Sequence, residues 1–307
     1  MIDKIVLVTR QTRLEGLVER FNSKGQAKFY IEHAGGDFAD YEAEHDAYRR
    51  ALDALRRSLD LGLKLQAMDR RFAATYLFNE ADLIVTAGQD GLVANTAKYV
   101  GGQPIVAVNP DPERFDGVLL PFSVGQARAA VGLTLEGRAR VRGVTMAEAV
   151  LDDGQRLLAF NDLFIGARTH VSARYRISFG GAAEPQSSSG VLVSTGAGST
   201  GWLSSVFNMA AGLAAGFGGK APPPPRLDWE DRRLAFVVRE PFVSRHSRAG
   251  IAAGLVPEGG SLVLESLMPS GGAVFSDGVE ADFLAFDSGA VARIGASPQK
   301  ARLVVPG

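Results

Sequence analysis

The sequence predicts an α/β domain with a parallel sheet over residues 1–121, followed by a β-rich domain with antiparallel strands over residues 122–307. In the first third, short apolar runs alternate with helical patterns, which is typical of a parallel sheet covered by helices. Further on, many short strand-like runs are separated by glycine turns, which is typical of an antiparallel domain. We place the boundary near Pro121, after the loop 109–117.

The composition excludes several classes of protein. The chain has 307 residues, 46% hydrophobic and 22% charged, enough for one large or two medium domains. A net charge of -1 provides neither the basic surface of a nucleic-acid-binding protein nor a polybasic membrane patch. No cysteine is present, which excludes disulfides and thiolate zinc sites. Apolar runs stay short of the roughly 20 residues of a membrane helix, and we see no signal peptide. We expect a cytoplasmic protein.

The first domain begins with strands that alternate with helices. Residues 4–9 and 104–108 are short apolar runs, as in buried strands, and the apolar spacing over 14–21 and 46–65 is helical. Residues 26–32 fit either a strand or an extension of the first helix. This order predicts a parallel sheet with helices on its faces.

The second domain is predicted to contain mainly hairpins. Residues 139–165 hold two strand-like runs joined by Asp152-Asp153-Gly154, and an Asp-Gly turn between such runs is typical of a hairpin. Further short strands are expected at 174–179, 191–194, 261–264, 273–276, 283–286, 291–294 and 302–305.

The stretch 81–100 combines a buried strand, a glycine turn and a helix. The turn is Gly88-Gln89-Asp90-Gly91, and this geometry lets backbone N–H groups and a helix N-terminus face an anion. Asp90 places one carboxylate at that positive end, between residues that let a ligand approach the backbone. Taken alone, Asp90 is also explained as a helix cap.

A second glycine loop, Gly196 to Gly201, reads G-x-G-x-x-G between a strand and a helix. That pattern is the dinucleotide fingerprint of dehydrogenases, but the fingerprint needs a βαβ unit with an acidic residue about 20 positions on. Here the surroundings are hairpins, so a dehydrogenase is disfavoured. A nucleotide site and a plain tight turn remain equal interpretations of this loop.

One further polar pair interrupts an apolar run. Asn161 and Asp162 stand between Phe160 and Leu163, where unpartnered polar groups are costly to bury. They can satisfy each other through turns or bind a base or ribose edge. The four histidines show no metal-ligand spacing with one another, and we interpret Trp202 as a packing residue.

Three polar clusters, in this order along the chain, resemble those of the NAD kinase family. Gly88-Gln89-Asp90-Gly91 stands where the family has Gly-Gly-Asp-Gly-Thr, Asn161-Asp162 where it has Asn-Glu or Asn-Asp, and the run 194–202 where it has Ser-Thr-Pro-Thr-Gly-Ser-Thr-Ala-Tyr. The stretches that resemble the divergent branch with the mitochondrial animal enzyme are 108–114, 188–190, 238–241, 276–278 and 286–290. The resemblance covers most of the chain, and the shared order and spacing make it specific.

The resemblance implies a Rossmann-like α/β domain and an antiparallel β-sandwich-like domain, with the active site between them. It implies transfer of the γ-phosphate of ATP, with Mg²⁺, to the 2′-hydroxyl of the adenosine ribose of NAD. Asp90 would be the general base on that hydroxyl, and no resident metal site is expected. The residues expected to bind the nucleotides are Gly88, Gln89, Gly91, Asn109, Asn161, Asp162, Thr195, Gly198, Ser199 and Thr200. The family is usually a homo-oligomer, a dimer or larger.

Two residues of the first loop depart from the family pattern. Gln89 replaces a glycine and Leu92 replaces a threonine, so polyphosphate stays an alternative donor. Ser189 replaces an aspartate near the expected nicotinamide end, which leaves the choice between NAD and NADH open. Two other functions also stay open: a nucleotide-binding protein with weak or no kinase activity, and a kinase of another small hydroxylated substrate on the same scaffold.

Overall fold

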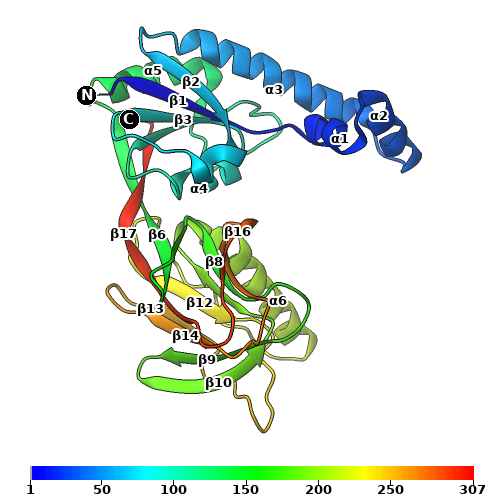
Figure 1. The fold of residues 1–307 in the computed structure, drawn as a ribbon, viewed down its shortest axis with the longest axis vertical. Helices are drawn as coiled ribbons and strands as arrows, with labels where there is room; N and C mark the ends of the chain where they lie inside the picture. Colours follow the sequence, from blue (N-terminus) through cyan, green and yellow to red (C-terminus); the bar gives the residue numbers. More distant parts are fainter. Residues whose placement is uncertain (1) are drawn as a thin grey trace. The chain divides into compact units, whose positions relative to one another are not determined.

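The computed structural model describes residues 2–307, which form two compact units (Figure 1). The first unit runs to Arg142 and includes Arg302–Gly307, and the second is Gly143–Ala301. No helix within residues 2–307 has both the length and the apolar character needed to span a membrane. We describe each unit by itself.

The first unit is built on a parallel sheet with the strand order β4-β3-β1-β2. Lys4 of β1 stands opposite Lys64 of β2 and Asp82 of β3, and all three strands run in the same direction. The elements are β1 (Lys4–Thr9), α1 (Arg13–Phe21), α2 (Lys24–His33), α3 (Phe38–Ser58), β2 (Lys64–Asp69), the 3-10 helix η1 (Arg70–Thr75), β3 (Asp82–Ala87), α4 (Asp90–Ala97), β4 (Pro104–Asn109), β5 (Phe122–Ser123) and α5 (Val124–Leu135).

Helices cover both faces of this sheet, which is why the strands β1, β3 and β4 are apolar without alternation. Leu7 and Val85 point to one face and join a core with Leu55 of α3 and Val131 of α5. The helix α4 lies on the opposite face (Figure 1), where its buried residues include Val93. The sequence prediction of a parallel α/β domain is confirmed.

The boundary of this unit differs from the one placed near Pro121. The short strand β5 pairs with β4 and α5 packs in the core of the first unit, so the chain leaves this unit only at Arg142. The end of the chain also belongs here, because Arg302 and Leu303 pair with the start of β4. Sequence patterns miss such returns because the pairing partners are far apart in the chain.

The bounds of two helices differ from the sequence prediction. The helix expected over 46–65 is α3, which starts earlier at Phe38 and ends at Ser58. The C-cap of α3 is Leu59, whose N–H donates to Leu55 O, and Gly62, with a positive φ of 76°, lies in the turn before β2 starts at Lys64. Residues 26–32 belong to a separate helix, α2, whose N-cap Ser23 accepts a hydrogen bond from Gln26 N–H.

The second unit contains two antiparallel sheets. One has the order β13-β12-β11-β8-β15-β16, and the other includes β10-β9-β14-β17 with β6 and β7. The elements are β6 (Arg140–Leu151), β7 (Arg156–Ala159), β8 (Asp162–Ala167), β9 (Ala173–Phe179), β10 (Ala182–Ser188), β11 (Val191–Ser194), the 3-10 helix η2 (Ala197–Thr200), α6 (Trp202–Gly216), β12 (Leu234–Val238), β13 (Ala253–Val256), β14 (Leu262–Ser266), β15 (Gly272–Ser276), β16 (Val279–Ala285) and β17 (Val291–Val305).

One apolar core joins the two sheets into a sandwich. It contains Val193 and Val274 from the first sheet and Ile177 and Leu264 from the second. The helix α6 packs through Leu203 on the outer face of β11 and β12. The expected β-sandwich-like domain is therefore confirmed.

Three details of this unit differ from the sequence prediction. The second run of 139–165 breaks at Phe160 and Asn161 into β7 and β8. The strands expected at 291–294 and 302–305 are the two ends of one strand, β17. The strands β10, β12 and β13 were not anticipated, since polar residues, a proline or a short length obscure their alternation.

Candidate functional site

The Gly88–Gly91 loop leaves the carboxyl end of β3 next to the carboxyl end of β1. Between these two strands the strand order reverses, since β2 lies on the far side of β1. Crevices at such reversals are where open α/β sheets bind ligands. Arg10, directly after β1, borders the loop: its Cδ is 3.6 Å from the position that a Cβ on Gly88 would occupy.

Asp90 is the first residue of α4, and its carboxylate is held from outside the helix. The N-cap residue is Gln89, which makes no side-chain cap bond. Asp90 Oδ1 instead accepts a hydrogen bond from Leu119 N–H at 2.8 Å. The structure thus assigns Asp90 to contact with a neighbouring loop rather than to capping, and this bond orients a half-buried carboxylate at a helix N-terminus.

The residues around Asp90 differ in how much space they leave. A Cβ on Gly88 would stand 2.7 Å from Leu92 Cδ2, so the glycine lets this leucine pack closely beneath the loop. Gly91 is exposed and has no neighbouring atom within 4 Å of an added Cβ. Gln89 is exposed as well. The open side of the loop is therefore at Gln89 and Gly91.

Asn109 stands at the end of β4 and organises the loop that follows. Its Nδ2 donates to Phe115 O at 2.9 Å and its Oδ1 accepts from Asp111 N–H at 3.0 Å. Gly117 has a φ of 65° and passes so close that a Cβ there would lie 2.8 Å from Asn109 Nδ2. The amide of Asn109 thus braces the loop that reaches Asp90 through Leu119.

The second glycine loop follows β11, which is antiparallel to both of its neighbours, β8 and β12. The G-x-G-x-x-G pattern therefore lies outside a βαβ unit, and the dehydrogenase fingerprint is excluded by its context. The loop continues as the 3-10 helix Ala197–Thr200 and then α6. Ser199 Oγ donates to Gly196 O at 2.7 Å within it, and Thr200 is exposed.

This loop is joined to the corner between β7 and β8, where Asn161 and Asp162 lie. Thr195, fully buried, donates from Oγ1 to Phe160 O at 2.6 Å and from its N–H to Asn161 O at 2.9 Å. Gly198 lies so close that a Cβ would come within 2.2 Å of Asn161 O. The fold thus brings together four of the residues predicted from the two clusters.

The same corner is held from its other side by Asp277, which follows β15. Asp277 Oδ1 accepts from Asn161 N–H at 2.7 Å and Oδ2 accepts from Phe160 N–H at 2.9 Å. Burial, and then the nearby negative charge of Asp277, raise the pKa of Asp162 to about 7. Asp162 is 9% exposed, so a carboxyl group that titrates near neutrality stands at this corner.

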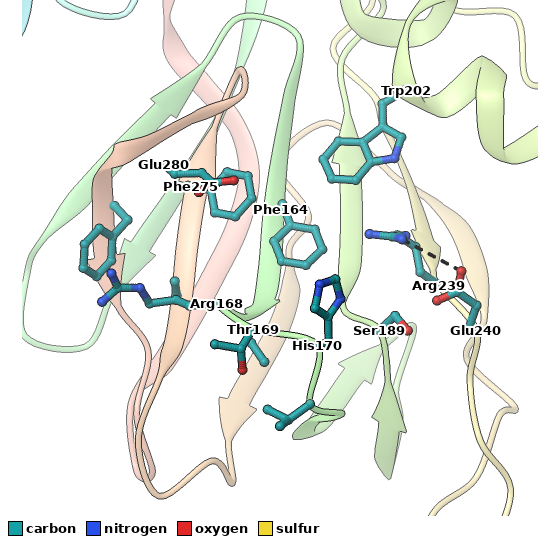
Figure 2. Close-up of a pocket in the computed structure, with 14 residues that line it drawn as sticks. Phe164, Arg168, Thr169, His170, Ser189, Trp202, Arg239, Glu240, Phe275 and Glu280 are labelled. Atoms are coloured by element: carbon teal, nitrogen blue, oxygen red, sulfur yellow. Dashed lines mark ion pairs between the residues drawn. The ribbon is translucent and has the colours of Figure 1, made fainter. Parts of the chain in front are cut away.

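Beside the corner is an aromatic pocket of about 550 Å³ on the outer face of the first sheet (Figure 2). Phe164 and Trp202 stack with ring centroids 5.6 Å apart and an interplanar angle of 9°, and Phe275 packs against Phe164 at 4.9 Å. The φ of Gly190 is 102°, and a Cβ there would meet the Phe164 ring at 2.5 Å. The glycine therefore makes room for the ring that floors the pocket.

Charged groups line the same pocket. The guanidinium of Arg239 lies 5.3 Å from the centroid of Trp202 and 3.8 Å from a carboxylate oxygen of Glu240 (Figure 2). Arg168 stacks on Phe283 at 4.3 Å across the pocket. Flat aromatic walls with a few polar groups suit a planar ring such as a nucleobase or nicotinamide.

Sequence reasoning missed Phe164, Trp202, Arg239 and Asp277 as site residues. Phe164 could have been found, because it is two residues after Asp162 on one strand and so shares its face. Trp202 directly follows the second glycine loop. Arg239 and Asp277 directly follow the strands β12 and β15. Both lie in stretches that resemble the family, 238–241 and 276–278, but the sequence assigned them no role.

Of the three predicted clusters, the one with Asp90 lies in the first unit, together with Asn109, and the two with Asn161 and Thr195 lie in the second. Each cluster is coherent within its own unit. Among residues 2–307, no group of three or more His, Asp or Glu side chains could hold a metal ion.

Comparisons with known proteins relate the chain to NAD kinases. It is 28% identical over 259 residues to NAD kinase 2, mitochondrial, of Rattus norvegicus. This match covers 68% of this chain and 61% of the rat protein. It is 27% identical over 123 residues to the Mus musculus protein of the same name, covering 38% of this chain and 27% of the mouse protein. The chain thus spans less than two thirds of the length of these curated relatives. No protein-family model matches it.

Solved structures share the fold at low identity. The crystal structure of yeast NADH kinase complexed with NADH superposes with a TM-score of 0.60 and 15% identity, covering 100% of this chain and 84% of that one. The NAD kinase from Archaeoglobus fulgidus in complex with ATP superposes with a TM-score of 0.58 and 17% identity, covering 98% and 93%.

Proposed function

From its relationship to the NAD kinase family we propose that the chain transfers the γ-phosphate of ATP to the 2′-hydroxyl of the adenosine ribose of NAD. The observation that carries the proposal is the setting of Asp90, a carboxylate on the first turn of α4, after a glycine loop at the strand-order reversal. Phosphoryl transfer asks a protein mainly for positioning, charge neutralisation and one base for the attacking hydroxyl.

In the proposed reaction Asp90 takes the proton of the 2′-hydroxyl. The ribose oxygen forms a bond to the γ-phosphorus, and the bond from that phosphorus to the β–γ bridging oxygen breaks, which releases ADP. The hydrogen bond from Leu119 N–H at 2.8 Å would keep the carboxylate aimed while the proton moves. The open backbone at Gly91 would receive phosphate oxygens.

NAD would be held by the second unit. Asn161 and Asp162 would hydrogen-bond the adenosine, beside the loop of Thr195, Gly198, Ser199 and Thr200. The aromatic pocket with Phe164 and Trp202 would take a flat ring of the dinucleotide.

Magnesium fits this scheme as a companion of the nucleotide. Mg²⁺ is usually held by one or two carboxylates together with substrate phosphates and water, and residues 2–307 offer no cluster of three metal-binding side chains. The ion would neutralise phosphate charge, with Asp90 as the nearby carboxylate.

The homo-oligomer and the cytoplasmic location expected from the sequence stay predictions. Light scattering after gel filtration tests the oligomeric state.

The test is an assay of the purified chain with ATP, Mg²⁺ and NAD, in which NADP is detected by an NADP-specific dehydrogenase. Asp90→Asn keeps an oxygen that accepts the Leu119 N–H, so the fold should persist while turnover falls about 10²–10⁴-fold. Asp116→Asn, at an exposed position of the neighbouring loop, is the control and should retain activity. Full activity of Asp90→Asn refutes the role of the base.

Two other outcomes would favour other functions. Binding of NAD without conversion would indicate a nucleotide-binding protein, an alternative suggested by the packing of Leu92 beneath the loop. No binding of NAD would indicate another small hydroxylated substrate.

A further inference from the structure

We propose that Asp277 is a positioning residue for the nucleotide site of the second unit: its carboxylate clamps the backbone of the Asn161–Asp162 corner and sets where the Asp162 carboxyl group is presented. The inference rests on the proposed function, because the ligand presented to this corner is taken to be NAD.

The clamp consists of four hydrogen bonds between two turns. Phe160 N–H donates to Asp277 Oδ2 at 2.9 Å, and the N–H groups of Asn161 and Asp162 donate to Oδ1 at 2.7 and 3.3 Å. Asp277 N–H donates in return to Asp162 O at 3.0 Å. Bonds to an ionised acceptor are roughly twice as strong as neutral ones, so three successive peptide units are held by one side chain.

The sheet itself is held together by other contacts. The strands β8 and β15 pair from Leu163 opposite Ser276 to Ala167 opposite Gly272. This pairing begins only after the corner residues Phe160, Asn161 and Asp162. The carbonyl groups of the corner are bound by Thr195. The carboxylate of Asp277 accepts from the N–H groups of the corner, and the residue does so from a left-handed conformation with φ 51°. Loss of the clamp should therefore turn the corner more than it weakens the sheet.

The charge of Asp277 adds an electrostatic effect on the side chain it positions. Burial, and then the negative charge of Asp277, raise the pKa of Asp162 to about 7. The carboxylate form accepts hydrogen bonds from ribose hydroxyls, so kcat/KM for NAD should rise as pH rises through about 7. Removal of the Asp277 charge lowers the pKa of Asp162 and moves this rise to lower pH.

The test compares Asp277→Asn with Asp287→Asn. Asp287 accepts a hydrogen bond from Gly272 N–H at 3.0 Å, so it ties the other end of the same β15–β16 hairpin without touching the corner. For Asp277→Asn we expect KM for NAD to rise roughly tenfold, from the loss of charge-assisted bonds, while KM for ATP stays unchanged. The pH profile of kcat/KM for NAD should move to lower pH in Asp277→Asn and stay in place in Asp287→Asn.

A measurement without turnover separates this proposal from the proposed function. A carboxyl ¹³C NMR titration of the unliganded protein, with the Asp162 signal assigned by Asp162→Asn, should show a lower pKa for Asp162 in Asp277→Asn. An unchanged Asp162 titration overturns the positioning role. So does an equal rise in KM for NAD together with an equal loss of thermal stability in Asp277→Asn and Asp287→Asn. Wild-type protein that makes no NADP refutes the proposed function, and the NMR titration then still decides whether Asp277 acts on Asp162.

Discussion

Replacing Asp162 by asparagine should stabilise the second unit at high pH more than at low pH. In the folded chain, burial and the charge of Asp277 raise the pKa of Asp162 from 3.8 to about 7. A carboxyl group whose folded pKa is raised contributes stability below its unfolded pKa and loses that contribution as pH rises through its folded pKa. The loss lies between about pH 4 and pH 7, and the neutral asparagine avoids it.

The size of the effect follows from the shift. Three pKa units at about 1.4 kcal/mol each correspond to roughly 4 kcal/mol between full protonation and full ionisation. By the linkage equation, about 2–3 kcal/mol of this loss in the free energy of unfolding falls between pH 5 and pH 8. The free energy of unfolding of Asp162→Asn, relative to wild type, should therefore increase by about that amount across this interval.

Urea unfolding at pH 5, 6, 7 and 8 measures this difference. Asn161→Ala is the matched control, because it alters the neighbouring residue without removing an ionisable group. A difference between Asp162→Asn and wild type that stays constant with pH, or that shrinks as pH rises, would refute the assignment of a buried, perturbed carboxyl group at this corner.

Two further substitutions test the second glycine loop and the aromatic pocket. Gly198→Ala would bring a Cβ within 2.2 Å of Asn161 O and should lower the free energy of unfolding by about 1–3 kcal/mol. In the control Gly201→Ala the nearest atom to the added Cβ is 3.4 Å away, so the loss should be smaller. Thermal unfolding compares the two variants, and equal losses would contradict the close packing at Gly198. Trp202→Ala should raise KM for NAD about tenfold by removing a stacking surface with little change in kcat, and Leu213→Ala, 56% exposed on the same helix, should leave steady-state kinetics unchanged; an unaltered KM in Trp202→Ala would remove the pocket from the site.

Local patterns in the sequence were enough to predict much of the first unit. The buried strand Asp82–Ala87 and the helix after it have periodicities that depend on neighbouring residues alone. The glycine turn between them is marked by its own residues. The antiparallel character of the second unit was also readable, because hairpin turns join strands that are adjacent in the chain.

The interpretation of single polar residues needed the tertiary structure. The sequence left Asp90 either as a cap or as a functional carboxylate, and the structure shows its partner to be Leu119, 29 residues away. Asn109 was predicted to bind nucleotide, and the structure shows that its amide braces the following loop; binding by this residue stays a prediction.

The sequence by itself determined many of the strands and helices, such as Asp82–Ala87 and the helix after it, and which short runs carry polar chemistry, because these properties follow from side chains close together in the chain. Only the tertiary structure decided that Asp277 supports Asn161 and Asp162 across more than a hundred residues, and that Phe164, Trp202 and Arg239 form one pocket. The physical reason is that burial, pKa and hydrogen-bond partners are set by groups that folding brings together, whatever their separation in the chain.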